Sequence, residues 1–396
     1  MTMKKIFAAI LILISGLLTG CGQKASGTNE TPKPSASVSA ADGVAATAPA
    51  DHGKLKVSFP AGSVRVSINI LAQELGYFKE EGVSVEPVNL GGVDALTAIN
   101  GSGDQLDILN TGFVNDIQSI GGGYDLTFIA GTAVEGGAVI ARKGQAERFK
   151  SADTIIDIEA VTGAKLGFVR NEAAWVITRQ YLLNNGVSGE TIAAIEAEDT
   201  GRISYYAQNT NVAQAVQAGE VDLGFLPLEY AILYADAYDL EIVTPSGALA
   251  PDYVCCREVT SAGRYASKYD AFVAYETARI RAFETYKHGV TDPEVRSKVV
   301  QTVVEYTGKE TEYVETCLYG GVTKYAVDPN TAGIVSYVEA AYNSGALAGN
   351  ATDFSQYDIR QNVSTGAYLE ALNNLIAREP DNAFYQELLA QYNAAN

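Results

Sequence analysis

The chain has 396 residues, of which 47% are hydrophobic, so it is long enough to form two domains with buried cores. Its formal net charge at pH 7 is −19. A chain this acidic is repelled by phosphate backbones and anionic head groups, which excludes nucleic acid and anionic lipid surfaces as its main partners.

The first 20 residues have the pattern of a secretory signal peptide. Lys4 and Lys5 precede a hydrophobic run over residues 6–18, which is too short to be a membrane-spanning helix. The run ends in Leu-Thr-Gly followed by Cys21, and these residues resemble a bacterial lipobox. The resemblance implies cleavage before Cys21 and lipidation of that residue. An ordinary signal peptide, in which Cys21 plays no part, is the alternative.

Residues 21–53 are rich in Ser, Ala, Thr, Pro and Gly and contain almost no large hydrophobic side chain. Such a segment cannot bury enough surface to offset the entropy lost on ordering, so it predicts a flexible tether. No later stretch is hydrophobic enough to cross a bilayer. We therefore expect lipid alone to hold the mature protein at the extracytoplasmic face of the bacterial cell membrane.

From residue 54 onward, short hydrophobic strands alternate with amphipathic helices. Residues 55–59 and 83–88 read as strands, and residues 66–78 read as the helix between them, with Gly76 near its end. Alternation of this kind predicts βα units and a mostly parallel sheet, which is an α/β fold.

A weak internal repeat indicates that this plan occurs twice. Residues 98–109 and residues 215–225 each contain a helix end, a glycine turn and a short strand, and the turns carry Asp107 and Asp222. Each strand leads into a loop and another helix, so we expect two similar lobes. We expect both aspartates to bond backbone groups at their turns, and the alternative is that they contact a ligand.

The hydrophobic strands at 126–130 and 138–142 would carry the chain out of lobe one, and strands near 240–243 and 253–256 would bring it back. The helical C-terminal part would extend lobe one, with its end, from about residue 362, against the back of that lobe. The expected division is a signal peptide at 1–20, the tether at 21–53, lobe one at 54–144, lobe two at 145–242, and lobe one again at 243–396.

Apart from Cys21, the sequence contains only Cys255, Cys256 and Cys317. Adjacent cysteines rarely pair with each other because the ring is strained, whereas a bridge from Cys317 to one of them stays open. The simplest interpretation is three buried thiols. No metal-ligand spacing is present, so we expect neither a metal nor a cofactor.

Residues 71–86, Leu-Ala-Gln-Glu-Leu-Gly-Tyr-Phe-Lys-Glu-Glu-Gly-Val-Ser-Val-Glu, resemble a signature of the nitrate/sulfonate/taurine and thiamine-precursor binding proteins of ABC importers. The resemblance covers roughly residues 54–345. It implies a type II periplasmic-binding fold, in which two lobes joined by a two-strand hinge close on a small ligand. It also implies a monomer that delivers this ligand to a membrane permease with a cytoplasmic ATPase.

In open α/β sheets, ligands bind beyond the carboxyl ends of the strands. The loops there precede helices, whose free N–H groups can hold an anionic group. The expected ligand-binding residues are Ser63, Arg65, Gly91, Thr111, Gly112 and Phe113 in lobe one, and Asn171, Ala173, Trp175, Pro227 and Glu229 in lobe two. Ser63, Thr111 and Asn171 could equally cap helices.

Three of these side chains have sharper expected roles. Arg65 suits a sulfonate, carboxylate or nitrate, and its alternative is a solvated surface charge. Glu229 suits an amine, and its alternative is an acid that stabilises the first turn of a helix. Trp175, the sole tryptophan, could stack on the ligand or pack in the core of lobe two.

Acids at Glu172 and Glu229 argue against a bare small anion, and a taurine-like zwitterion fits better. We expect a ligand of the sulfonate, taurine or nitrate class. A thiamine-precursor aminopyrimidine is the alternative, because the family resemblance includes such ligands. Many of the better-known members have an aromatic-acid-Pro group after the lobe-two strand, whereas residues 226–230 here read Leu-Pro-Leu-Glu-Tyr, so the substrate of those members does not carry over.

Two other functional classes fit less well. This fold and family also support enzymes such as pyrimidine synthases, but only His52 and His288 are present and His52 lies in the tether. No nucleophile elbow, H-E-x-x-H pair or Walker-type loop occurs, so we expect no catalytic residue. An adhesin or structural lipoprotein would need no cleft, and the repeated lobe plan argues against one.

Overall fold

The computed structural model describes residues 50–101, 103–169, 172–197, 200–321, 323–343, 347 and 352–396. The expected signal peptide, the lipidation of Cys21 and most of the expected tether lie outside these residues and stay predictions. The last residues of that tether are already structured, because β1 begins at Gly53 and the His52 N–H donates to the Gly82 carbonyl at 2.8 Å.

Lobe one is built on a mixed sheet. β1 and β2 run parallel, and β1 continues onto the edge strand β3 through a bridge between Val57 and Ile108. The other four strands follow the order β13-β4-β12-β3. The strands are β1 (Gly53–Ser58), β2 (Val83–Val88), β3 (Leu109–Gly112), β4 (Thr127–Val134), β12 (Val254–Thr260) and β13 (Lys324–Tyr325). The strands expected at 55–59 and 83–88 are confirmed, whereas the expected mostly parallel sheet is wrong for lobe one, because β3, β4, β12 and β13 pair antiparallel.

The first helices of lobe one are α1 (Ser67–Glu74), α2 (Tyr77–Glu80), α3 (Gly92–Asn100) and α4 (Phe113–Gly121). The single helix expected at 66–78 is wrong in one respect, since it is divided into α1 and α2. Gly76 sits between them with φ of +84°. A left-handed residue cannot continue a right-handed helix, and glycine adopts this conformation without steric cost.

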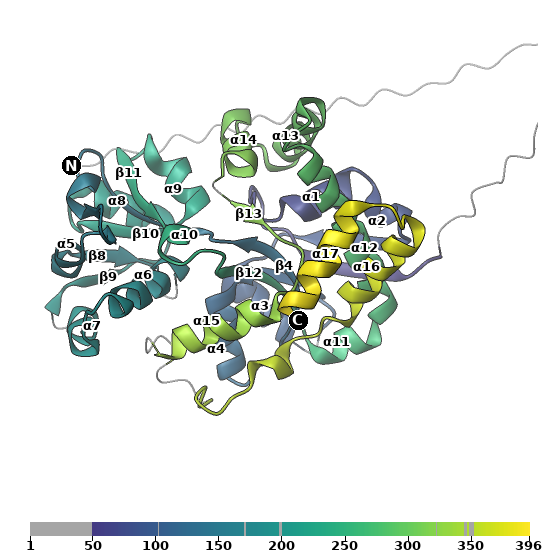
Figure 1. Cartoon of the computed structure of the whole chain (residues 1–396), viewed down its shortest axis with the longest axis horizontal. Coiled ribbons are helices and arrows are strands. Elements are labelled where there is room, and N and C mark those ends of the chain that lie inside the picture. Colours follow the sequence, from purple (N-terminus) through teal and green to yellow (C-terminus); the bar gives the residue numbers. More distant parts are fainter. Residues whose placement is uncertain are drawn as a thin grey trace, which may run out of the picture. The chain divides into compact units, whose positions relative to one another are not determined.

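Lobe two contains a five-stranded sheet in the order β11-β5-β10-β8-β9. Its strands are β5 (Gly137–Arg142), β8 (Leu166–Phe168), β9 (Ile203–Tyr205), β10 (Leu223–Pro227) and β11 (Leu240–Pro245). Figure 1 shows the lobe-two helices gathered around this sheet. They are α5 (Ile158–Gly163), α6 (Ala173–Asn184), α7 (Gly189–Glu196), α8 (Asn209–Ala218) and α9 (Leu228–Ala235). Between β5 and α5 the chain forms a short 3₁₀ helix, η1 (Ala146–Phe149), and a pair of short strands, β6 (Lys150–Ser151) and β7 (Ile155–Ile156).

The chain crosses between the lobes twice. It leaves lobe one after β4, at Glu135, and returns through α10 (Ser246–Leu249) to β12. The two crossings are tied together, since Glu135 N–H donates to the Tyr253 carbonyl at 3.2 Å. The sheet of lobe two therefore extends over 137–245, wider than the expected 145–242. The hydrophobic pattern of β5 could not reveal this, because it does not show which sheet the strand joins.

The expected repeat is present in both lobes. Asp107 accepts a hydrogen bond from the backbone N–H of Lys56 at 2.8 Å. Asp222 accepts one from the backbone N–H of Lys165 at 2.9 Å. In each case the backbone N–H of the aspartate also bonds the carbonyl of the same lysine, at 2.7 and 2.8 Å. The structural role expected for both aspartates is confirmed.

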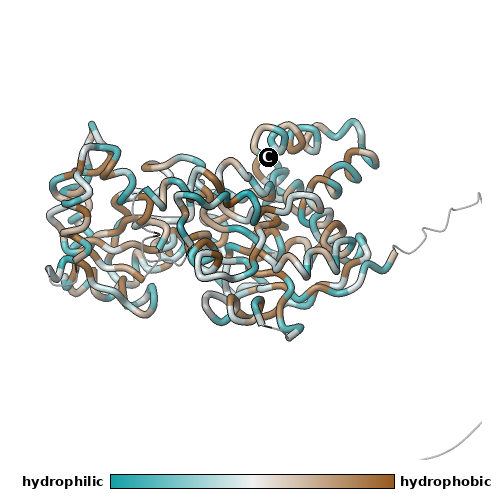
Figure 2. Tube along the Cα trace, turned by 90° about the horizontal axis from the view of Figure 1, so that it is seen from below, coloured by the Kyte–Doolittle hydropathy of each residue, from teal (hydrophilic) through white to brown (hydrophobic). Residues whose placement is uncertain are grey.

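The C-terminal part is helical, as expected. Its main helices are α11 (Ala262–Ser267), α12 (Tyr269–His288), α13 (Pro293–Thr307), α14 (Thr311–Tyr319), α15 (Thr331–Asn343), α16 (Gly366–Arg378) and α17 (Ala383–Ala395), with the short η3 (Ile359–Asn362) before α16. α16 packs along α12 and α17 packs on α16 (Figure 1). Figure 2 shows hydrophobic and hydrophilic residues interspersed along the helical turns of the chain, as amphipathic packing requires.

The hydrophobic core is not fully divided between the lobes. One cluster lies in lobe one and includes α12 and α16, and another lies around β10 and α8 in lobe two. A third cluster spans both lobes and contains Phe128, Tyr253, Tyr337 and Ala174. This packing runs along the segments that cross between the lobes and along α15.

Candidate functional site

A cavity of about 240 Å³ lies between the lobes, where loops following several strands meet. It is smaller than the ~300–1,000 Å³ pockets that hold drug-sized ligands, so it suits a solute of few atoms. Six of the expected site residues line it, namely Ser63, Arg65, Gly91, Thr111, Gly112 and Glu229. It is also lined by residues that were not among the expected site residues, including Pro60, Ala61, Gly92, Asn110, Tyr230 and Cys256. We call it the cleft cavity.

The main polar contact across this cavity joins Arg65 of lobe one to Glu229 of lobe two. Arg65 Nη2 donates to Glu229 Oε2 at 3.1 Å, and Arg65 Nε also contacts Oε1. A two-point contact between a guanidinium and a carboxylate is both strong and directional. The side chains are only 22% and 9% exposed, so water and salt screen the pair incompletely.

This ion pair changes what was expected of both residues. Arg65 was expected to face an anion or solvent and Glu229 an amine, but the structure makes each the partner of the other. Burial lowers the pKa of Arg65, yet the carboxylate of Glu229 more than offsets this, so the pKa lies well above its ordinary value. Arg65 therefore stays charged, and a ligand that binds either side chain must displace the other.

The lobe-one side of the cleft cavity supplies hydrogen-bond donors. Asn110 is buried at its wall, and its Nδ2 has no hydrogen-bond partner among the described residues. A buried donor left unpaired costs about 1–3 kcal/mol, which a ligand oxygen would recover. The cavity is also lined by Val66, Gly91 and Gly112, the N-cap residues of α1, α3 and α4, and these N-termini carry no side-chain cap. Their free N–H groups add to the donors.

The capping roles considered for Ser63 and Thr111 are not seen. Ser63 Oγ accepts a hydrogen bond from the backbone N–H of Arg65 at 3.3 Å, within its own loop. Thr111 precedes Gly112, the residue at the N-cap position of α4, so its hydroxyl does not cap that helix. Both side chains remain at the wall of the cleft cavity.

The lobe-two side of the cavity supplies the carboxylate of Glu229, and the carboxyl of Glu172 lies near this pair without lining the cavity. Glu172 sits at the N-cap position of α6 without bonding its first turn. Burial raises the pKa of Glu172 to about 8, although the charge of Arg65 pulls it down and that of Glu229 pushes it up. Within the described part of the chain, the Glu172 carboxyl has no hydrogen-bond partner. It is thus a nearly neutral acid beside the ion pair, and a cationic group would favour its ionised form.

Two expected ligand contacts belong to the hydrophobic core. Phe113 is 1% exposed and packs edge-on against Tyr337, with ring centroids 5.2 Å apart. Trp175 stacks on Phe168 at 5.7 Å, and its indole N–H donates to Glu196 at 3.1 Å. For Trp175 the core alternative therefore describes the structure, and neither ring lines the cleft cavity.

Two further residues lie beside the site and do not line it. Ala173 is the first residue of α6, and Pro227 is the last residue of β10, where it pairs with Gly137. Asn171 lies outside the described residues, so its role stays a prediction. Cys256 faces the cavity for reasons of tertiary structure, which the local sequence pattern could not show.

The three cysteines of the described part form no disulfide. Cys255 and Cys256 nevertheless lie with their sulfur atoms 3.4 Å apart. Cys317 is buried in α14, and burial raises its pKa to about 12. The bridge from Cys317 that the sequence left open is therefore not formed.

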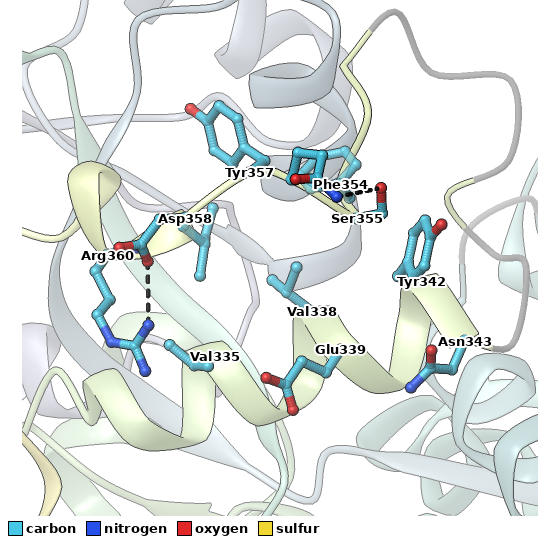
Figure 3. A pocket seen from close by; sticks show the side chains of 12 residues that line it. Val335, Val338, Glu339, Tyr342, Asn343, Phe354, Ser355, Tyr357, Asp358 and Arg360 are labelled. Carbon is cyan, nitrogen blue, oxygen red and sulfur yellow. Dashed lines mark hydrogen bonds and ion pairs between the residues drawn. The ribbon is translucent and has the colours of Figure 1, made fainter.

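A larger cavity, of about 510 Å³, lies between α15 and residues 354–360 (Figure 3). Its cation, Arg360, is already paired with Asp358 at 3.2 Å. Val335, Val338 and Tyr342 of α15 face the segment opposite. The cavity shares no lining residue with the cleft cavity, and its lining comes from the C-terminal part alone.

Among the described residues, no group of three or more His, Cys, Asp or Glu side chains is placed to hold a metal ion. No helix in the described part of the chain combines the length and the hydrophobicity needed to cross a membrane.

Solved structures share this architecture, although the sequence matches no protein-family model and no curated protein. The alkanesulfonate-binding protein SsuA from Xanthomonas axonopodis pv. citri, bound to MOPS, has a TM-score of 0.59 at 15% identity, covering 80% of this chain and 99% of that one. The periplasmic nitrate-binding protein NrtA from Synechocystis PCC 6803 has a TM-score of 0.62 at 13% identity, covering 83% and 90%.

A third structure, the ligand-binding component of an ABC-type import system from Staphylococcus aureus with zinc bound, has a TM-score of 0.60 at 13% identity, covering 81% and 99%. A fungal protein described as having the generic periplasmic binding protein structural fold, from Candida albicans, covers 79% of this chain with a TM-score of 0.55. At these identities the likeness establishes the fold. The expected periplasmic-binding fold is therefore confirmed.

Proposed function

We propose that this chain, which has the periplasmic-binding-protein fold, is the extracytoplasmic substrate-binding lipoprotein of an ABC importer. It would capture a small polar solute in the cleft cavity and deliver it to a membrane permease driven by a cytoplasmic ATPase. The fold of the solved import-system components and the position of the cavity between two lobes support this role. Lipid on Cys21 would hold the protein, as a monomer, at the cell membrane.

The solute class that we propose is that of the sulfonates, taurine and nitrate, and within it an anion that also carries an amine. The observation that carries this choice is the opposite chemistry of the two walls. Lobe one presents the guanidinium of Arg65 and the unpaired amide of Asn110, whereas lobe two presents the carboxylate of Glu229, with the carboxyl of Glu172 near enough to feel both charges. A zwitterion can satisfy both walls at once.

A bare anion would fit less well. Arg65 is the only cation among the described residues that line the cleft cavity, and its guanidinium is already paired with the carboxylate of Glu229. An anion that displaced Glu229 would leave that carboxylate partly buried without a partner, which costs more than a neutral hydrogen bond gains. An ammonium group on the same ligand would take the place of Arg65 beside Glu229.

Ligand binding would also stabilise one relative placement of the lobes. Since such a ligand contacts both walls, it binds best when the lobes are together, and it shifts the population toward that form. Arg65 and Glu229 would then be joined through the ligand and not directly. The cluster around Tyr253 and Tyr337 would serve as the pivot.

An aminopyrimidine of the thiamine-precursor type is the second candidate. Tyr230 lines the cleft cavity and remains 36% exposed, so its ring is accessible to a planar ligand. The exocyclic amine of such a ligand would donate to Glu172 or Glu229. An aminopyrimidine needs no strong anion to bind in this way, so a comparison of matched ligands can distinguish it from the zwitterion.

We propose no catalytic role. Histidine is the usual acid–base catalyst near neutral pH, but His52 lies beside the first strand and His288 ends α12, so neither lines the cleft cavity. A pyrimidine-synthase activity remains the alternative of another class. Turnover of an aminopyrimidine precursor by the purified protein would support it.

A thermal-shift series with matched ligands tests the proposal. Taurine, ethanesulfonate and ethylamine differ only in which charged end they keep, and nitrate and an aminopyrimidine complete the series. A ligand at a hundredfold excess over its Kd stabilises the protein by about 2.7 kcal/mol, enough to raise Tm by several degrees. Taurine alone should do so. A shift with ethanesulfonate equal to that with taurine would overturn the zwitterion assignment, and a shift with none would overturn the solute class.

A further inference from the structure

Cys255 and Cys256 are neighbours in β12, yet their sulfur atoms lie only 3.4 Å apart. Successive side chains of a strand normally point to opposite faces, which separates adjacent thiols. Here the pairing of β12 with β4 shifts register between Val254 and Cys256 and again between Cys256 and Arg257. Such irregularities twist a strand locally and redirect its side chains. The strand therefore brings the two thiols together.

The thiol pair contacts both the segment that crosses between the lobes, at Gly136, and the cleft cavity. Cys255 Sγ fills the space above Gly136, where an added Cβ would lie 2.5 Å from it. Cys256 lines the cleft cavity, and its Sγ lies 3.6 Å from Nη1 of Arg65. Both thiols are almost fully buried, at 3% and 1% exposure. The pair thus lies between the crossing segment at Gly136 and the guanidinium of Arg65, which contacts Glu229 across the cleft cavity.

The chemistry of the pair favours reaction with a disulfide. The hydrogen bond from Cys256 lowers the pKa of Cys255 to about 7, and the same bond raises that of Cys256. The nearby guanidinium of Arg65 also favours a thiolate. A thiolate whose pKa is near ambient pH is the most effective attacking group in thiol–disulfide exchange.

We propose that Cys255 and Cys256 form a reversible disulfide with each other, so that the floor of the cleft carries a redox-sensitive site. The co-reactant is a low-molecular-weight disulfide, RSSR. The Cys255 thiolate attacks one of its sulfur atoms and releases RS⁻, which leaves a mixed disulfide on Cys255. Cys256 then loses its proton and attacks the sulfur of Cys255, which releases the second RS⁻. Two electrons pass from the cysteine pair to RSSR, and two RSH molecules result.

This bond would be labile. Consecutive Cα atoms are only ~3.8 Å apart across a trans peptide, whereas the Cα atoms of disulfides are usually ~4.4–6.8 Å apart. Closing the small ring therefore strains the strand, and strained disulfides have more oxidising potentials and are easily reduced. The cysteine pair is suited to reversible oxidation and not to a permanent cross-link.

Oxidation and opening of the cleft would be coupled. Both thiols are buried, and the pair borders the cleft cavity through Cys256, where Arg65 and Glu229 join the two walls. Loosening that ion pair should let the reagent reach Cys255 past Cys256 and so speed oxidation of the pair. Ring closure would in turn move Cys256 Sγ away from Arg65, so that the guanidinium would lose this contact and be held less firmly in place.

Thiol trapping tests both the formation of the disulfide and its coupling to opening of the cleft. Reduced purified protein is treated with bis(2-hydroxyethyl) disulfide, blocked with iodoacetamide, digested without reductant and examined by mass spectrometry. The peptide with Cys255 and Cys256 should be unalkylated and lighter by two hydrogen atoms, and dithiothreitol should restore both thiols. The Cys255→Ser and Cys256→Ser variants should instead keep one molecule of reagent on the remaining cysteine.

The Glu229→Gln variant tests the coupling, with Glu147→Gln as its matched control, since Glu147 pairs with Lys150 at an exposed site in lobe two. Oxidation should be several-fold faster in Glu229→Gln and unchanged in Glu147→Gln. Full alkylation of both thiols after treatment, a persistent adduct on the wild-type pair, or a bond to Cys317 would overturn the disulfide. Equal oxidation rates in both variants and the wild type would overturn the coupling.

Discussion

Arg65 and Glu229 lie in different lobes, and Nη2 of the arginine donates to Oε2 of the glutamate at 3.1 Å. The contact places opposite charges on the two walls of one small cavity. A second link reinforces it, since the Tyr313 hydroxyl of α14 donates to the Glu229 carbonyl at 3.3 Å. The beginning of α9 is therefore held to lobe one at two points, Arg65 and Tyr313.

Replacing Glu229 by glutamine should lower the free energy of unfolding by about 1–3 kcal/mol, because it leaves the partly buried guanidinium of Arg65 without its counter-charge. Glu147→Gln removes a carboxylate from an exposed pair and should cost less than ~0.5 kcal/mol. Urea denaturation of both variants measures the difference. Equal and small losses would mean that the Arg65 pair contributes no stability.

Stability should fall as pH rises, and Glu172 should account for part of that fall. Its pKa is about 8 in the folded protein and 4.5 ordinarily, so the folded state binds more protons between these values. The stabilisation from the bound proton is complete below pH 4.5 and is lost as pH rises through 8, by at most ~1.4 kcal/mol per pH unit.

Glu172→Gln, which resembles the protonated acid, should therefore flatten the slope over pH 5–8. It should not abolish the slope, because burial also raises the pKa of Glu276 to about 8. Urea denaturation at several pH values gives both slopes. Identical slopes in variant and wild type would show that Glu172 does not titrate as its burial requires.

The two repeated aspartates should differ in what they contribute. Asp107 is 1% exposed and also binds Lys268 at 2.7 Å, whereas the Asp222 side chain is 39% exposed. Asp107→Ala leaves buried donors unpaired and should cost about 2–4 kcal/mol, whereas Asp222→Ala should cost about 1 kcal/mol. Neither should change ligand affinity. A larger loss at Asp222, or weaker ligand binding in either variant, would argue against a purely structural role.

Trp175→Phe should weaken the core of lobe two and leave ligand binding intact. The smaller ring loses part of the stacking on Phe168 and leaves Glu196 without the indole donor, at a cost of about 1–3 kcal/mol. Affinity for the best ligand of the thermal-shift series should stay within about twofold. Lost binding at unchanged stability would instead place the indole against the ligand.

The sequence predicted those parts of the fold that depend on local pattern. The strands at 55–59 and 83–88 and the repeated turns at Asp107 and Asp222 follow from hydrophobic periodicity and from short-range backbone bonding. The division of the first helix at Gly76 was missed, because a glycine near a helix end can either continue or stop it.

The candidate site could be predicted only in part. Strand ends locate the loops, so Arg65 and Glu229 were both found, but their mutual contact depends on how two lobes meet. Phe113 and Trp175 were assigned to the cleft because they lie in segments that follow strands, but both rings are buried in the core. Cys256 was missed because a register shift in β12, and no motif, turns it to the cavity.

Calorimetric titration of taurine into the wild-type protein, Glu229→Gln and Glu147→Gln tests the central claim most directly. Taurine should bind the wild type and Glu147→Gln with equal affinity, and Glu229→Gln at least tenfold more weakly, since its ammonium group loses the carboxylate that receives it. Equal affinity in all three proteins, or no heat of binding in any of them, would contradict a zwitterion held between Arg65 and Glu229.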